Sequence, residues 1–83
     1  MKSTIIVKPK VSALLLARAK VGYSTLDLAK AAGVHYTTIH SIEAGRSKVI
    51  LPKTAKRLAD ALNKPIEDLF GLEVGVINHV SNN

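Results

Sequence analysis

A short polar face stands out near the middle of the chain. Ile39 and Ile42 are spaced as the buried side of one helix. The opposite side carries phenol, hydroxyl and imidazole groups, on Tyr36, Thr37, His40 and Ser41. These groups donate and accept hydrogen bonds, and the tyrosine ring and the threonine methyl also offer apolar contacts. Such a face can recognise another molecule by its pattern of donors, acceptors and methyl groups.

Basic residues are concentrated on both sides of this face. The chain has a formal net charge of +6, from 12 basic and 6 acidic residues. Residues 1–57 carry a net charge of +9 and residues 58–83 a net charge of −3. Cations around a projecting helix suit the phosphates of DNA, whose major groove admits a helix. Taken alone, the charge is also compatible with an ordinary solvated surface.

The residue types argue against an enzyme. We find no Ser/His/Asp set, no paired carboxylates expected in a cleft and no phosphate-binding glycine loop, and 83 residues are few for a domain that encloses a pocket. The chain has no cysteine, and His35 and His40 have no carboxylate beside them, so we expect no metal and no cofactor.

Two short helices must position the polar face. Ser24 is a good N-cap, and Asp27, three residues later, completes a capping box. Gly33 ends this first helix because glycine readily adopts positive φ, and Gly45 ends the second, which we expect over about 36–44. With so short a linker the two helices cross steeply, and the second projects outward. This pattern is a helix-turn-helix.

The segment LAKAAGVHYTTIHSIEAGR resembles the core of the lambda-repressor-like (Xre) family of bacterial and phage DNA-binding regulators. The matching positions are Ser24, Leu28, Ala29, Gly33, Val34, Ile39, Ile42, Glu43 and Gly45. The resemblance covers about residues 10–70 and implies a compact five-helix domain that places its third helix in the major groove.

The resemblance also implies roles for individual residues. Base contacts fall on Tyr36, Thr37 and Ser41, with His40 beside them on the same face. Contacts with the DNA backbone fall on Ser24, Thr25, His35, Thr38, Arg46 and Lys48. Thr25 stands where the family usually has a longer glutamine, and the loop before Pro52 is about one residue longer than the common pattern.

Arg18 and Glu43 occupy the positions of a partly buried ion pair in the family. The pair would hold the third helix against the first. A direct contact between Arg18 and a DNA phosphate is the alternative, and we favour the structural role.

We predict an all-α fold of five helices, with short β-segments at the two ends as an addition. Residues 1–9 form an arm or short strand, 10–71 the helix-turn-helix domain, and 72–83 a tail, strand or dimerisation segment. The helices are expected at about 10–20, 24–33, 36–44, 52–62 and 65–70. The expected core residues are Val11, Leu14, Leu15, Leu26, Leu28, Ala29, Ala32, Ile39, Ile42, Ala55, Leu58, Ala59, Leu62, Ile66, Leu69 and Phe70.

The β-prone ends require a separate explanation. Ser3–Val7 and Val74–Val80 are rich in β-branched residues, so we expect them to pair as a small sheet, within one chain or across a dimer. Two disordered ends are the alternative.

The leading hypothesis is a sequence-specific transcriptional regulator, a repressor that binds a two-fold-related operator as a homodimer. Its expected partners are double-stranded DNA and a second copy. The alternative is an antitoxin or anti-regulator that binds a protein partner, such as a toxin or anti-repressor, and also controls its own operon. A controller of a restriction–modification operon is a narrower variant. Apolar runs are too short for a membrane span or signal peptide, so we expect a cytoplasmic protein.

Overall fold

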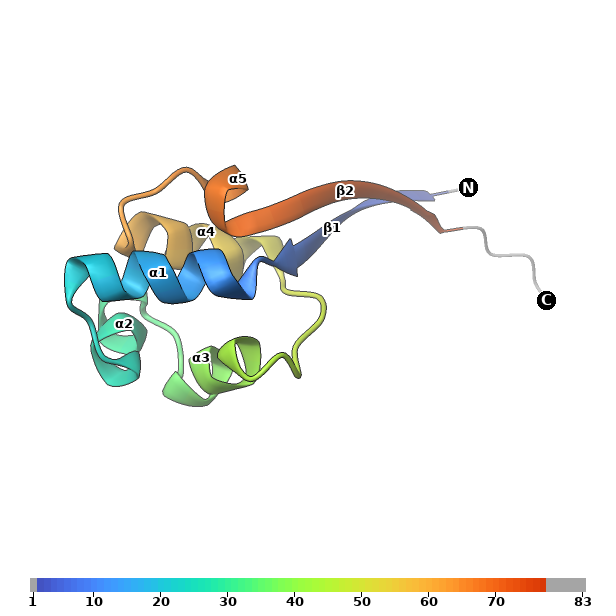
Figure 1. Ribbon diagram of the computed structural model, residues 1–83. Helices are drawn as coiled ribbons and strands as arrows, with labels where there is room; N and C mark the ends of the chain where they lie inside the picture. The colour runs from blue at the N-terminus through green and yellow to red at the C-terminus, as the bar shows by residue number, and fades with distance from the viewer. Residues whose placement is uncertain (1, 78–83) are drawn as a thin grey trace.

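The computed structural model describes residues 2–77, which form five helices and two strands (Figure 1). The helices are α1 (Val11–Val21), α2 (Thr25–Ala32), α3 (Tyr36–Glu43), α4 (Pro52–Ala61) and α5 (Ile66–Leu69). The strands are β1 (Lys2–Pro9) and β2 (Phe70–Ile77). In Figure 1, α1 crosses the helical body, with α4 and α5 on one side and α2 and α3 on the other.

The core between these helices is entirely apolar. Each helix contributes to it, and the base of the ribbon adds Val7 and Phe70. The buried residues are Val7, Leu14, Ala17, Leu28, Ala29, Ala32, Ile39, Ile42, Ile50, Ala55, Leu58, Ala59, Leu62, Leu69 and Phe70. Among residues 3–75 no polar side chain is buried, so the polar groups of this part of the chain lie at or near the surface.

The all-α prediction is wrong. β1 and β2 form a two-stranded antiparallel sheet whose register runs from Lys2↔Ile77 to Pro9↔Phe70. Helix five was expected to include Phe70, but α5 ends at Leu69 and Phe70 has the extended backbone of a strand. β-branched residues in both segments favour the extended conformation. Pairing of the strands also gives their backbone N–H and C=O groups hydrogen-bond partners within the protein, where disordered ends would bond only to water. The ends therefore pair within one chain; residues 78–80 of the predicted segment lie outside the described residues.

Three residues expected in the core lie outside it. Leu15 and Leu26 are exposed and Val11 is only partly buried. The reason is the direction in which the helices pack. Helix α1 enters the core through Leu14 and Ala17, which turns Leu15 outward, while α2 faces the core through residues 28, 29 and 32.

The turn between α2 and α3 fixes how α3 projects. Gly33 has a φ of 69°, in the left-handed region that favours glycine. The N–H of Val34 then donates to the carbonyl of Ala29 at 3.0 Å, as in a Schellman cap, and the Val34 side chain packs against the core. This turn leads directly into α3, which lies at the outer edge of the body in Figure 1.

The base of the sheet is tied to the helical body. Val7 and Phe70 are buried, and the N–H of Ile50 donates to the carbonyl of Val7 at 2.8 Å. Beyond this point the two strands leave the body together as a ribbon (Figure 1). The molecule is consequently elongated, with principal extents of 49 × 22 × 20 Å. Among the described residues, none of the helices has the length and apolar character needed to cross a membrane.

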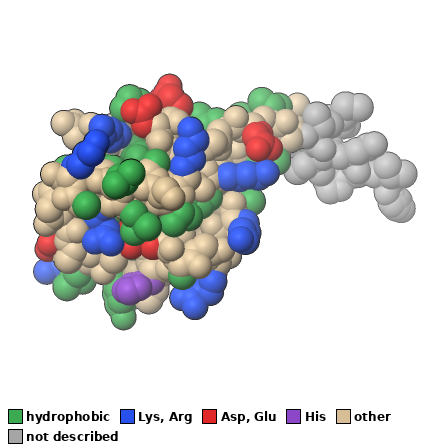
Figure 2. Space-filling view, viewed as in Figure 1, with side chains coloured by type: hydrophobic (Ala, Val, Ile, Leu, Met, Phe, Trp, Pro, Cys, Tyr) green, Lys and Arg blue, Asp and Glu red, His purple; other side chains and the backbone are tan. Residues whose placement is uncertain are grey.

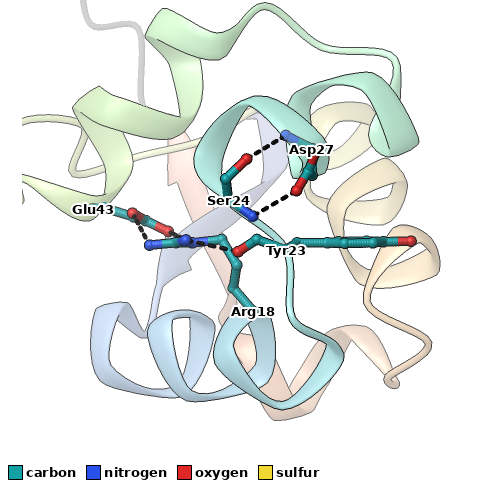
Figure 3. Close-up of polar contacts among 5 residues, drawn as sticks. All are labelled: Arg18, Tyr23, Ser24, Asp27 and Glu43. Carbon is teal, nitrogen blue, oxygen red and sulfur yellow. Dashed lines mark hydrogen bonds and ion pairs between the residues drawn. The ribbon is translucent and has the colours of Figure 1, made fainter.

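One ion pair links α1 to the end of α3 (Figure 3). Arg18 donates from Nε to Glu43 Oε2 at 2.8 Å and from Nη2 to Oε1 at 3.0 Å. Its Nη1 also donates to the carbonyl of Tyr23, at 2.9 Å, in the turn before α2. The two side chains are 21% and 13% exposed, so much of the pair is withdrawn from water. A single guanidinium thereby joins α1, the turn before α2 and the end of α3.

We predict that Glu43→Ala lowers the free energy of unfolding by about 2–3 kcal/mol, because it leaves the Arg18 guanidinium partly buried without its carboxylate. This loss is somewhat below that of a fully buried pair, since both side chains retain some contact with water. Urea unfolding followed by circular dichroism measures the difference.

Asp60→Ala is the matched control. Its carboxylate also pairs with a cation, Lys56 at 2.6 Å, but the two side chains are 66% and 62% exposed. An exposed pair of this kind contributes at most about 0.5 kcal/mol. Equal losses in the two variants would contradict the structural role of the Arg18–Glu43 pair.

Candidate nucleic-acid interface

The outward face of α3 is held in place by the core behind it. Ile39 and Ile42 are buried on the inner side. On the outer side Tyr36, Thr37 and His40 are exposed and Ser41 is partly buried. The structure thus brings together the four residues that the sequence analysis assigned to base contacts.

His35 begins α3 as its N-cap. Its Nδ1 accepts a hydrogen bond from the N–H of Thr37 at 3.3 Å and lies 2.8 Å from Thr37 Oγ1. The backbone N–H can only donate, so it requires an unprotonated Nδ1, and the Thr37 hydroxyl then donates to the same nitrogen. His35 therefore orients Thr37 in addition to lying near the expected DNA backbone.

Three aromatic rings form a cluster on this face. The ring of Tyr36 stacks on that of His35 with centroids 5.6 Å apart, and His40 meets it edge-on at 5.3 Å. Such contacts restrict the rotamers of Tyr36 before any ligand is present. The sequence analysis did not identify this cluster, although the spacing of Tyr36 and His40, four apart on one helix, was a usable signal.

The N-terminus of α2 is closed by a complete capping box (Figure 3). Ser24 Oγ accepts from the N–H of Asp27 at 3.0 Å, and Asp27 Oδ2 accepts from the N–H of Ser24 at 3.0 Å. The Ser24 N–H is therefore already used within the capping box. Thr25, the first residue of α2, is partly buried.

Hydrogen bonds that the Asp27 carboxyl accepts from Ser24 lower its pKa below the ordinary value of 3.8. The bond from the Ser24 backbone is the main cause, followed by that from the Ser24 side chain, while the positive charge of Lys30 contributes less. Asp27 consequently favours its charged form at the helix start, where the helix dipole also favours an anion.

The loop after α3 carries cations beside the polar face. The backbone N–H groups of Arg46 and Ser47 donate to the Ser41 carbonyl at 2.9 and 3.2 Å, which anchors the start of the loop. Arg46 and Lys48 extend their side chains into solvent. Lys48 and Lys8 of β1 also line one depression of about 330 Å³, so the fold adds Lys8 to the cations near α3.

The surface shows the same arrangement. In Figure 2 histidine side chains lie at the edge of the molecule that α3 occupies, and Lys or Arg side chains lie on either side of them. A polar projecting helix between cations is suited to a groove lined by phosphates. Among residues 2–77 there is no group of three or more His, Asp or Glu side chains that could hold a metal ion.

We predict that Asp27→Asn destabilises the protein at neutral pH but not in acid. Asparagine keeps a carbonyl acceptor for the Ser24 N–H and removes the charge. Because the folded pKa of Asp27 is lowered, its contribution is present above about pH 3.8 and is lost as the pH falls through the folded value. Urea midpoints of both proteins, measured along a pH series, should converge at the acid end. A difference that is the same at every pH would contradict a role for the charge.

Comparison with known families agrees with this geometry. A family model described as helix-turn-helix matches residues 14–69, which extend from the middle of α1 to the end of α5. No curated protein matches the chain. The family match covers more than half of the sequence and leaves out both strands of the ribbon. The chain therefore belongs to the lambda-repressor-like (Xre) helix-turn-helix family of DNA-binding regulators.

Proposed function

We propose that this protein is a sequence-specific transcriptional repressor that binds a two-fold-related operator as a homodimer. The observation that carries the proposal is the outward polar face of α3, held by Ile39 and Ile42 and placed between cations. One helix of eight residues reads few base pairs, and two such helices about one DNA turn apart supply the missing specificity.

Base recognition is assigned to Tyr36, Thr37, His40 and Ser41. The ring of Tyr36, restricted by two imidazoles, is suited to packing on a thymine methyl. Thr37 offers its methyl to the groove while its hydroxyl contacts His35. Because no Arg, Asn or Gln lies on this face, recognition relies on apolar contacts and single hydrogen bonds.

Backbone recognition is assigned to residues at the start of α2, at the start of α3 and in the loop after α3: Ser24, Thr25, His35, Thr38, Arg46 and Lys48. Arg46 and Lys48 supply the charge that releases counterions from DNA. The α2 N-terminus adds helix-dipole attraction, although Asp27 places a negative charge in the same turn.

A second candidate function is an antitoxin that binds a protein partner. A hollow of about 180 Å³ on α1 and α5 favours it, since Leu16 lies exposed there and two lysines, Lys20 and Lys64, outnumber the one acid, Asp68. Such a surface suits an apolar partner segment flanked by acids. This candidate would be supported by a toxin gene next to this one, if co-expression of this protein restored the growth of cells that produce the toxin.

Selection of bound duplexes from a random pool tests the main proposal. We expect enrichment of an inverted repeat whose half-sites are centred about 10 base pairs, or a multiple, apart. Recovery of sequences with no common motif would contradict sequence-specific binding.

Two substitutions should separate base contacts from phosphate contacts. Tyr36→Ala should reduce the preference for the selected site over random DNA by about 1–3 kcal/mol. Arg46→Gln should weaken binding to all DNA sequences by the same factor and reduce the slope of log affinity against log salt by about 0.9. Titrations by fluorescence anisotropy at several salt concentrations measure both quantities.

Lys64→Gln is the control for Arg46→Gln, because it removes the same charge from the turn between α4 and α5, on the far side of the body from α3 (Figure 1). Its salt slope should equal that of the unmodified protein. A slope lowered equally by both variants would assign the effect to net charge instead of a local contact.

A further inference from the structure

The ribbon formed by β1 and β2 has one apolar face that continues the core. Directly paired residues of an antiparallel sheet share a face, and successive residues alternate. The pairs Val7↔Leu72 and Ile5↔Val74 therefore lie on one face, which also carries Phe70. At the base of the ribbon Val7 and Phe70 are buried in the core. Farther out the same face has no cover from the described residues of the body.

The opposite face of the ribbon is already satisfied within the chain. Lys8 and Glu73 form an ion pair there, at 3.3 Å. Ile6 pairs with Glu73, and its side chain reaches diagonally over Gly75, where a Cβ would stand 2.5 Å from Ile6 Cδ1, so the glycine makes room for the isoleucine. Among residues 3–75, the exposed large apolar side chains of the ribbon, Ile5, Leu72 and Val74, all lie on the apolar face.

The exposed part of this face forms a patch with the loop before α4. Leu72, Ile5 and Val74 are 47%, 53% and 70% exposed, and in the loop Val49 and Leu51 are 60% and 73% exposed. A groove of about 540 Å³ connects Ile5 with Val49 and Leu51. We call these five residues the ribbon patch. An isolated two-stranded ribbon is marginal in water, so a patch of this kind implies a covering partner.

The charge distribution favours a second copy of this chain as that partner. The protein carries +6 overall, so two copies repel across most of their surfaces. The ribbon patch contains no charged residue, and β2 belongs to the segment 58–83 whose net charge is −3. By contrast, the hollow on α1 is lined by Lys20 and Lys64 against the single acid Asp68, so a symmetric contact there would bring an excess of like charges together.

The edges of the ribbon favour the same partner. The sheet has only two strands, and within the described residues the outer edge of β1 meets a further segment only through the Val7–Ile50 bridge. Open strand edges present backbone donors and acceptors that another strand satisfies. A second ribbon supplies both an apolar face and strand edges.

We infer that the ribbon patch is the dimer interface: the ribbon of one copy packs on the same patch of a second copy about a two-fold axis. This inference rests on the proposed function, because it names the surface through which the proposed homodimer forms. The contact itself can be tested without DNA. The ribbon leaves the body at the end away from α2 (Figure 1), and none of the five patch residues belongs to α3. Both recognition helices therefore stay free for DNA.

Sedimentation equilibrium of Val74→Lys tests the inference. The side chain of Val74 is mostly exposed, so the fold should persist, as circular dichroism and thermal unfolding can verify. A lysine at this mostly exposed position of the patch should raise the dimer dissociation constant at least about tenfold. Glu73→Lys is the matched control: it places the same side chain at the neighbouring position on the opposite face and changes the net charge more. It should leave the dimer nearly intact.

Charge complementation tests the symmetry of the contact. Val74→Lys and Val74→Glu should each be monomeric alone and should form a heterodimer when mixed, since the two-fold axis brings the two patches together. Dimers that survive Val74→Lys, or that are disrupted by Glu73→Lys to the same extent, would overturn the inference. A wild-type protein that remains monomeric would also overturn the inference. The same holds if Leu16→Lys in α1 abolishes the dimer and Val74→Lys does not.

DNA binding provides an independent readout. Val74→Lys should bind a duplex with one half-site as a single wild-type subunit does, with the same slope of log affinity against log salt. It should lose the higher affinity that the wild-type dimer has for the full inverted repeat. A wild-type dimer that binds no DNA selectively would contradict the proposed function and leave the assigned interface unaffected.

Discussion

The fold depends on the arginine–glutamate pair that joins its first and third helices. A core of 15 apolar residues can hold the helices together, but it specifies their relative positions only through shape. The guanidinium of Arg18 adds direction, because its planar donors meet both oxygens of Glu43 and the carbonyl of Tyr23 at once. Three segments are thereby placed relative to one another. The position of α3, and with it the orientation of every group on its outer face, follows from that arrangement.

Much of the helical body could be predicted from local signals. The capping box at Ser24 and Asp27, the left-handed Gly33 and the spacing of Ile39 and Ile42 each depend on a few neighbouring residues, and each is found as the sequence indicates. The inward side of α1 could not be read in the same way. Leu14, Leu15 and Leu16 are consecutive and equally apolar, so only contacts with α3 and α5 decide which of them is buried.

The all-α class was wrong for a related reason. Strand pairing between residues 2–9 and 70–77 joins the two ends of the chain, and local propensity does not reveal such contacts. The β-branched composition indicated extended segments, but only the register shows that Phe70 turns from helix to strand. At the site, the residues of α3 could be chosen from helical spacing, whereas the His35 cap and the ring cluster around Tyr36 depend on side-chain rotamers. Such rotamers cannot be predicted from the order of residues alone.

The separation between the two sides of α3 has an evolutionary consequence. The side chains that fill the core from this helix, Ile39 and Ile42, are distinct from those on its outer face. Under the proposed assignment, substitutions at 36, 37, 40 and 41 would alter the preferred DNA sequence at little cost in folding free energy, because none of these side chains fills the core. Related proteins could then differ in target while they keep the same scaffold.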